Sequence, residues 1–391
     1  MLENNKPIVL VFVSHYFPAY KAGGQLRTIV NMVEHLSGEF EFWIVTRDRD
    51  LGDEISFQSV KKDVWQNVGK AKVYYVSPSK QTLRKLAKLI ADTPHDILYL
   101  NSFFSFTFSI KPLLAVKYYG ASRKPVILAP RGEFSEGALN LKQEKKYVYV
   151  KLSQMIGLYN NILFQASSKH EMNDIVTALN MPKEQIRIAM DLPEKKVLGI
   201  EGPEACKIKP SGTLKVIFLS RLSPMKNLVF ALKVLQLVTR NVKFDVYGPR
   251  EDSSYWSACR KLIDELPENV KVQYCGSVTP DEVKSTFACY DLFLFPTLGE
   301  NYGHVIAESL SVGTPVLISD QTPWKNLEVD GLGWELPLTS LHGFVEKLEC
   351  FVLESSDSRI KNRLTIQKKV FERLFDPESF IANRSLFRSV L

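Results

Sequence analysis

The chain has 391 residues, of which 45% are hydrophobic and 24% are charged, a balance typical of globular rather than disordered or fibrous proteins. A single core rarely extends over this length, so we expect two domains. No apolar run reaches the length of a membrane span, the start carries no signal-peptide pattern, and the five cysteines show no close pairing. We therefore expect a cytoplasmic protein with neither a disulfide framework nor a zinc site.

The formal net charge of +7 is concentrated in the first half of the chain. Residues 80–151 alone carry 13 basic and 5 acidic residues. This stretch predicts either a set of solvated helix faces or a surface that contacts anionic lipid headgroups, which would place the protein peripherally on the inner membrane face. We do not expect nucleic acid as a partner, because no recognised nucleic-acid motif accompanies the charge.

Short apolar runs alternate with longer amphipathic segments along the first half of the chain. The predicted strands are 8–14, 41–46, 72–76, 97–101, 125–130 and 163–166. The predicted helices are 24–37, 80–92, 106–119, 142–158 and 169–179. Strand–helix alternation of this kind predicts a parallel, doubly wound sheet.

A second alternation follows residues 192–211, a stretch rich in Pro and Gly that we interpret as a linker. The predicted strands are 214–220, 242–247, 270–274, 292–296 and 315–319. The predicted helices are 227–239, 255–266, 280–288, 303–311, 340–353 and 377–391. We expect an α/β protein with two Rossmann-like domains, 1–200 and 212–376, and a final helix that packs back on the first. Ligands of open α/β sheets bind at the carboxyl ends of the strands, so a cleft between the domains is the expected site.

Glu300 and Glu308 are separated by seven residues, directly after a predicted strand. The helix expected between them rises about 12 Å over that spacing, roughly the length of a sugar diphosphate with part of a ribose. The amides of Asn301, Tyr302 and Gly303 would lie at the start of this helix, where an anion is favoured. The pattern therefore indicates a phosphate-bearing ligand.

Arg221 and Lys226 stand five positions apart at the turn after another predicted strand. A forked guanidinium and a mobile ammonium make a suitable clamp for a diphosphate. Gly23 and Gly24 open a helix after the first strand, where backbone amides can form an anion nest.

Three further sets of residues follow predicted strands. Gly248 follows one strand of the second domain, and Gly276 follows the next, where the backbone up to Val278 is expected to flank a nucleobase. In the first domain, Arg131 and Glu133 follow a strand, and a basic segment beginning at Lys142 lies downstream.

The segment from Glu300 to Glu308 resembles the paired-glutamate motif of glycosyltransferase family 4, whose members have the two-domain fold called GT-B. The resemblance implies that Glu300 bonds the transferred sugar and that Glu308 holds the ribose hydroxyls. It also implies that the backbone near Asn301, Tyr302 and Gly303 contacts the sugar and phosphate, that Arg221 and Lys226 bind the pyrophosphate, and that the Gly23–Gly24 loop faces the donor phosphates.

The resemblance implies a retaining, hexosyl-type transfer from a nucleotide diphosphate sugar to a glycan or lipid-linked acceptor, without a metal ion or other cofactor, in surface polysaccharide biosynthesis. Arg131 stands where many relatives have a histidine near the sugar, so Arg131, Glu133 and Lys142 are expected to line the sugar or acceptor pocket. The chain departs from the family at residues 189–192, where relatives often have Asn-Gly. A role of this loop in ribose binding or as a hinge is therefore not expected.

Two alternatives stay open. A non-catalytic relative would bind a glycan or nucleotide sugar as a scaffold, and an epimerase on the same fold would convert the donor without an acceptor. A Rossmann dehydrogenase is disfavoured, because no Gly-x-Gly-x-x-Gly turn follows the first strand.

Overall fold

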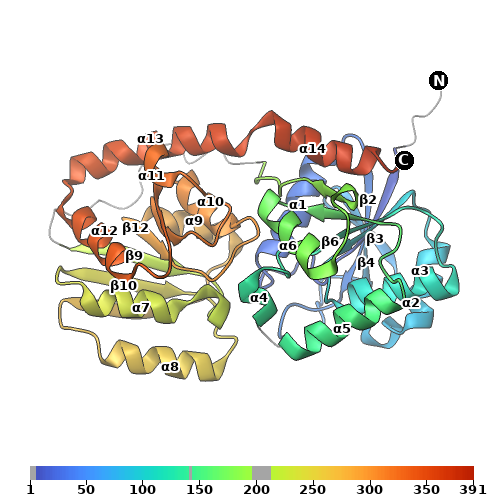
Figure 1. Cartoon of the computed structure of the whole chain (residues 1–391), viewed down its shortest axis with the longest axis horizontal. Coiled ribbons are helices and arrows are strands. Elements are labelled where there is room, and N and C mark those ends of the chain that lie inside the picture. The colour runs from blue at the N-terminus through green and yellow to red at the C-terminus, as the bar shows by residue number, and fades with distance from the viewer. Residues whose placement is uncertain (1–5, 141–142, 196–212) are drawn as a thin grey trace. The chain divides into compact units, whose positions relative to one another are not determined.

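The computed structural model describes residues 6–140, 143–195 and 213–391. The chain divides into two compact units, unit 1 (Met1–Lys195 with Pro377–Leu391) and unit 2 (Lys196–Asp376), each treated by itself below (Figure 1). The predicted site residue Lys142 and most of the predicted linker 192–211 lie outside the described residues.

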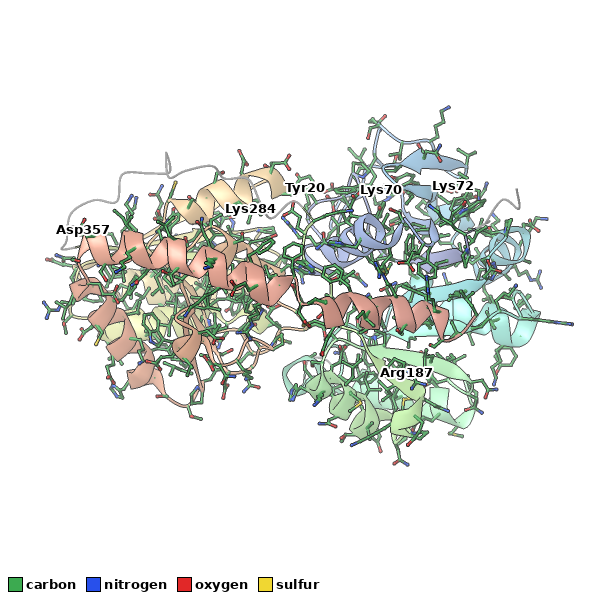
Figure 2. The ribbon with its side chains drawn as sticks, turned by 90° about the horizontal axis from the view of Figure 1, so that it is seen from above. Tyr20, Lys70, Lys72, Arg187, Lys284 and Asp357 are labelled. Atoms are coloured by element: carbon green, nitrogen blue, oxygen red, sulfur yellow. The ribbon has the colours of Figure 1, made fainter. Side chains whose placement is uncertain are left out.

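Among the described residues of unit 1, eight strands form one sheet in the order β3-β4-β2-β1-β5-β6-β7-β8. All neighbouring strands are parallel except β3 and β4, which form an antiparallel hairpin with Lys70 and Lys72 at the surface (Figure 2). The strands are β1 (Ile8–Phe12), β2 (Glu41–Arg47), β3 (Trp65–Val68), β4 (Ala71–Val76), β5 (Ile97–Asn101), β6 (Val126–Ala129), β7 (Ile162–Ala166) and β8 (Ile186–Ile188). Chain direction along the sheet reverses between β1 and β5, which creates a topological switch point there.

Helices cover both faces of this sheet and bury two separate apolar layers. The helices are α1 (Gly24–Leu36), α2 (Leu83–Asp92), α3 (Lys111–Tyr119), α4 (Glu136–Asn140), α5 (Gln143–Met155), α6 (Lys169–Leu179) and α14 (Pro377–Arg388), with a π-helical turn, Phe106–Ile110, and short 3-10 helices at Pro78–Lys80 and Lys183–Gln185. Side chains of α1 and α14 pack in one layer, and side chains of α2, α3, α5 and α6 pack in the other.

The last helix, α14, completes the core of unit 1 although unit 2 separates it from the rest of that unit in the sequence. Phe387 is fully buried, and its ring lies 5.4 Å from Phe40, 6.2 Å from Phe42 and 5.3 Å from Tyr99 between centroids. Arg388 pairs with Glu39 at the surface. Aromatic packing therefore holds α14 on unit 1.

The described part of unit 2 contains a parallel six-stranded sheet in the order β11-β10-β9-β12-β13-β14. The strands are β9 (Leu214–Leu219), β10 (Val242–Tyr247), β11 (Val270–Gly276), β12 (Leu292–Phe295), β13 (Val316–Ser319) and β14 (Gly333–Leu336). Its helices are α7 (Leu228–Leu237), α8 (Ser253–Asp264), α9 (Val283–Ala288), α10 (His304–Ser311), α11 (Leu327–Asp330), α12 (Leu341–Leu353) and α13 (Ser356–Leu374), with 3-10 turns at Pro224–Lys226 and Pro280–Glu282. The switch point of this sheet lies between β9 and β12.

The expectation of two parallel, Rossmann-like sheets is confirmed. The sequence patterns missed β3, β8, β14, α4, α11 and the 19-residue helix α13, which is polar on most of its surface. The cysteines also differ from expectation. Cys259, Cys275 and Cys350 are free, but Cys289 is disulfide-bonded. Within the described ranges, no helix combines the length and apolar character that crossing a bilayer requires.

We predict that Phe387→Ala destabilises the protein by about 3–5 kcal/mol, because it leaves a cavity among three buried aromatic rings. Ile381→Ala on the same helix is the control. Ile381 is exposed, so its loss should change the free energy of unfolding by less than about 0.5 kcal/mol. Urea unfolding of both variants measures the difference, and equal effects would contradict the packing role assigned to Phe387.

Candidate active site

The switch point of unit 2 brings together two loops that carry predicted site residues. Because β9 pairs with both β10 and β12, the loops after β9 and β12 leave the same edge of the sheet side by side. The first loop contains Arg221 and Lys226, and the second contains Glu300. The parallel topology therefore places residues that lie more than seventy positions apart in one location.

An ion pair between Lys226 and Glu300 joins these two loops. Both side chains are largely buried, with exposed fractions of 15% and 13%, and the Lys226 ammonium lies 5.6 Å from the centre of the Phe295 ring. A cation and a carboxylate at this depth stabilise each other, because neither is fully hydrated.

Hydrogen bonds along the loops reinforce the pair. The Leu298 amide donates to the Met225 carbonyl at 2.8 Å, and the Asn227 side-chain amide donates to the Pro296 carbonyl at 2.9 Å. The Thr297 hydroxyl donates to the Met225 carbonyl at 3.1 Å. The two loops are consequently preorganised around Lys226 and Glu300.

Glycine is required at the start of α10. Gly303 caps the helix with φ 79°, in the left-handed region, and a Cβ atom there would lie 2.9 Å from the Ile306 Cδ1 atom. The Trp324 indole donates to the Tyr302 carbonyl at 2.7 Å and so fixes the peptide before Gly303. Glu308 is buried within α10. The segment from Asn301 to Glu308 thus has the predicted arrangement of a loop that leads into a helix.

Arg221 lies close to this pair of loops but has a different partner. Its guanidinium bonds the Glu251 carboxylate at 3.2 Å, and both side chains are about one-third exposed. Gly248 allows the backbones to approach here, since a Cβ atom would lie 1.8 Å from the Ser220 carbonyl oxygen. The Gly248 amide in turn donates to the Gly276 carbonyl at 2.8 Å.

The loops after β9, β10 and β11 are therefore linked at the same sheet edge, and Val278 lies in the last of them. Sequence reasoning missed one feature of this edge. The Arg250 guanidinium lies 4.7 Å from the Tyr274 ring centre and 5.6 Å from the Trp256 ring centre. These two aromatic rings orient the exposed arginine, for which the described part of the chain offers no acidic partner.

In unit 1, Gly23 and Gly24 lie at the switch point between β1 and β5. Gly23 is the N-cap of α1 with φ 67°, and Gly24 is the first helical residue. The preceding loop is fixed by the Asp50 carboxylate, which accepts from the Tyr20 amide at 2.8 Å and from the Lys21 amide at 3.2 Å. The glycine pair is thus the start of a well-supported helix rather than a free loop.

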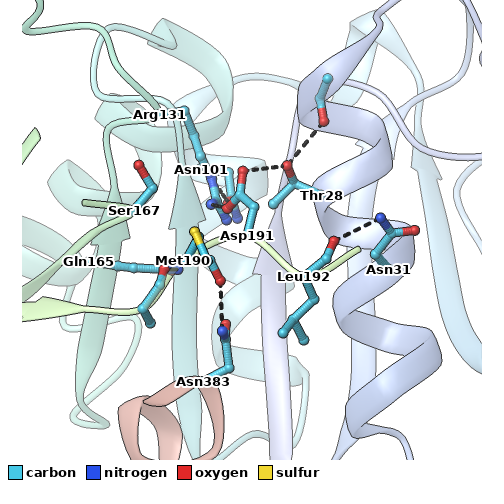
Figure 3. A network of polar contacts seen from close by, with 12 residues as sticks. Thr28, Asn31, Asn101, Arg131, Gln165, Ser167, Met190, Asp191, Leu192 and Asn383 are labelled. Atoms are coloured by element: carbon cyan, nitrogen blue, oxygen red, sulfur yellow. Dashed lines mark hydrogen bonds and ion pairs between the residues drawn. The ribbon is translucent and has the colours of Figure 1, made fainter. Parts of the chain in front are cut away.

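Arg131 lies at the centre of a buried network behind this helix start (Figure 3). Its guanidinium pairs with Asp191 at 2.5 Å and donates to the Asn101 side-chain oxygen at 2.9 Å and to the Tyr99 hydroxyl at 2.5 Å. The other Asp191 oxygen accepts from the Thr28 hydroxyl, near the start of α1, at 2.8 Å. Asp191 therefore connects Arg131 to the helix that Gly23 and Gly24 begin.

The electrostatics of this network favour a charged Arg131. Burial lowers the pKa of Arg131, but Tyr99, Asp191 and Glu171 raise it by more, so its pKa lies above the ordinary value. Burial raises the pKa of Tyr99 to about 12. No role was predicted for Asp191, and only its position within residues 189–192, the segment that departs from the family pattern, could have indicated one.

Glu133 is half-buried, and both of its carboxylate oxygens accept hydrogen bonds. Its carboxylate accepts from the Ser102 hydroxyl at 2.6 Å and from the Phe103 and Phe104 amides at 2.6 and 2.9 Å. Burial raises the pKa of Glu133, although these hydrogen bonds oppose the shift. Glu171 similarly accepts from the Gly132 amide at 2.6 Å. Two carboxylates thus fix the loop that follows β6.

The comparisons with known proteins agree with this architecture. Residues 206–363 match the family model described as glycosyl transferases group 1. The solved structure of HepE from Anabaena in complex with UDP-glucose superposes with a TM-score of 0.69 at 15% identity, over 98% of this chain and 99% of that chain. The fold is therefore the GT-B fold, as the resemblance implied.

Two curated relatives are more similar in sequence but cover less of the chain. An uncharacterised 41.2 kDa protein in the cps region of Klebsiella pneumoniae is 24% identical over 63% of this chain and 66% of its own length. A poly(glycerol-phosphate) alpha-glucosyltransferase of Bacillus subtilis is 32% identical over 28% of this chain and 16% of its own length. The chain matches less than two thirds of the length of either relative.

We predict that Asp191→Ala destabilises the protein by about 3–5 kcal/mol, because it leaves the Arg131 charge buried without its carboxylate. The double variant Arg131→Met with Asp191→Ala should cost less than the sum of the two single variants, because it removes both charges. Chemical unfolding of the three variants completes the cycle. Strictly additive effects would show that the two groups are not energetically coupled.

Proposed function

We propose that this chain is a retaining glycosyltransferase that moves a hexose-type sugar from a nucleotide diphosphate sugar to a glycan or lipid-linked acceptor. The observation that supports this most directly is the Lys226–Glu300 pair at the switch point of unit 2, beside the start of α10. A cation for phosphate and a carboxylate for sugar hydroxyls are thereby held side by side. The presence of UDP-glucose in the complex of a structural neighbour supports the same donor class.

In this proposal the positive charge of the site acts mainly on the leaving group. Lys226 and Arg221 bind the diphosphate oxygens, and the amides of Asn301, Tyr302 and Gly303 add partial positive charge at the helix start. As the bond between the anomeric carbon and the phosphate oxygen breaks, the growing negative charge meets these preorganised donors. They supply the charge that a metal ion would otherwise provide, so we propose that the reaction needs no metal or other cofactor.

The two glutamates orient the donor. Glu300 holds the sugar hydroxyls and, through its ion pair, keeps Lys226 directed into the site before the donor binds. Glu308 holds the ribose hydroxyls. The acceptor oxygen then attacks from the face that the diphosphate leaves, which retains the anomeric configuration. Gly248, Gly276 and Val278 let the backbone approach the nucleoside.

Unit 1 has a supporting and an acceptor-side role in this proposal. Gly23 and Gly24 face the donor phosphates from the start of α1. Arg131 and Glu133 act as positioning residues, because their charged groups are occupied by contacts within unit 1. The cps-region and poly(glycerol-phosphate) relatives support a role in surface polysaccharide synthesis.

We place the protein at the cytoplasmic face of the membrane, where the excess of basic residues in 80–151 suits anionic lipid.

A panel of nucleotide sugars should first identify the donor by calorimetric binding. With that donor and an acceptor extract, we predict that Arg221→Ala and Glu300→Gln each lower transfer by about a hundredfold or more, since each removes a contact that acts on the reacting sugar diphosphate. Chromatography of product and released nucleoside diphosphate measures both effects.

Lys271→Ala serves as the control, because Lys271 is exposed near the opposite end of the sheet, at the start of β11. This variant should retain full transfer. Near-normal transfer by Arg221→Ala or Glu300→Gln would refute the proposal. Donor binding without nucleotide release would indicate a scaffold, and conversion of the donor sugar without an acceptor would indicate an epimerase.

A further inference from the structure

Helix α5 exposes apolar side chains on its outer face. Met155 is 82% exposed and Tyr147 is 64% exposed, and Val148 and Leu152 are each 55% exposed. Positions 147, 148, 151, 152 and 155 recur at the spacing of one helix face. The opposite face packs into unit 1 through Val150 and Ser153, which are buried.

This distribution is unusual for a surface helix of a globular protein. A surface helix normally has one apolar face toward the core and a polar face toward water. The inner face of α5 packs against the core of unit 1, but the helix still presents four large apolar residues to solvent. A contiguous exposed stripe of this kind indicates a surface that is covered by a partner.

Neighbouring residues extend the stripe and make it basic. The Lys117 ammonium donates to the Gly157 carbonyl at 2.9 Å, which joins the end of α3 to the chain directly after α5. Tyr118 and Tyr119 at the end of α3 are exposed as well. Lys145 and Lys151 are exposed on α5, where the Lys151 ammonium lies 5.6 Å from the Tyr147 ring centre.

We propose that the α5 surface, made of Tyr147, Val148, Lys151, Leu152 and Met155 together with the tyrosines that end α3, docks on an anionic lipid bilayer. Aromatic and aliphatic side chains insert at the level of the headgroups, while lysines beside them pair with lipid phosphates. The exposed Lys117, Lys145 and Lys151 beside the stripe supply the complementary charge that an anionic membrane, rather than a neutral protein surface, selects.

This inference deepens the proposed membrane-face location by naming the element that makes the contact. It does not require the chemistry of unit 2, because α5 and α3 both belong to unit 1. Lipid binding can therefore be measured without donor or acceptor. If the chain does not bind lipid, the transferase proposal still stands. If the chain transfers no sugar, the lipid-binding experiment still tests the α5 surface.

The test is co-sedimentation of the full chain with vesicles of phosphatidylcholine alone or mixed with phosphatidylglycerol. We expect binding to the anionic vesicles, weakened by high salt, and much weaker binding to the neutral ones. The double variant Leu152→Glu with Met155→Glu should lower the partition coefficient by at least about tenfold, because it removes apolar insertion and adds negative charge.

The matched control is the double variant Val329→Glu with Leu364→Glu. It replaces two exposed apolar residues of unit 2 and adds the same negative charge. It should bind vesicles like the unmodified chain, and calorimetric binding of the nucleotide sugar should be unchanged in both double variants. Absence of vesicle binding, equal loss in the control, or equal binding to neutral vesicles would overturn the proposal. So would light scattering that shows a dimer broken by the α5 variant, because the stripe would then pair two copies.

Discussion

The candidate site depends on one ion pair, between Lys226 and Glu300, at the point where the sheet of unit 2 reverses its strand order. Neither residue could hold the other if β9 and β12 were not neighbours, because the two side chains come from separate strand ends. The pair keeps a cation and a carboxylate directed to the same location without a ligand. Because these charged side chains are already in position, they need little reorganisation when a diphosphate binds. Such preorganisation is the physical basis of electrostatic catalysis.

In unit 1, the loops that follow the strands are held by a different kind of contact. Carboxylates accept from backbone amides there, as the half-buried Glu133 does from Phe103 and the buried Glu171 does from Gly132. Asp191 links Arg131 to the beginning of α1 through Thr28. Such contacts cost desolvation, so they stabilise only when every charged group finds a partner. Loops held in this way are rigid supports, whereas the loops of unit 2 carry the groups suited to chemistry.

The sequence predicted the parts of the fold that periodicity and strand-end motifs encode. The core strands and the start of α10 at Gly303 lay close to where the patterns indicated, because apolar runs and a helix-opening glycine are local signals. Helix α13 was missed, since polar residues hide the few buried positions, such as Ile366 and Val370, that define its inner face. The role of Asp191 could not be predicted from the sequence either, because its partner Arg131 lies sixty positions away and only the tertiary structure brings them together.

The docking of α14 has a consequence for the order in which the chain is made. Unit 2 is an insertion between the body of unit 1 and its last helix, so all of unit 2 is synthesised before Phe387 emerges. Domains generally fold as units while the ribosome proceeds. Unit 2 can therefore complete its core first, although unit 1 begins earlier, and the first sheet keeps an uncovered aromatic face over Phe40 and Phe42 until α14 has been synthesised.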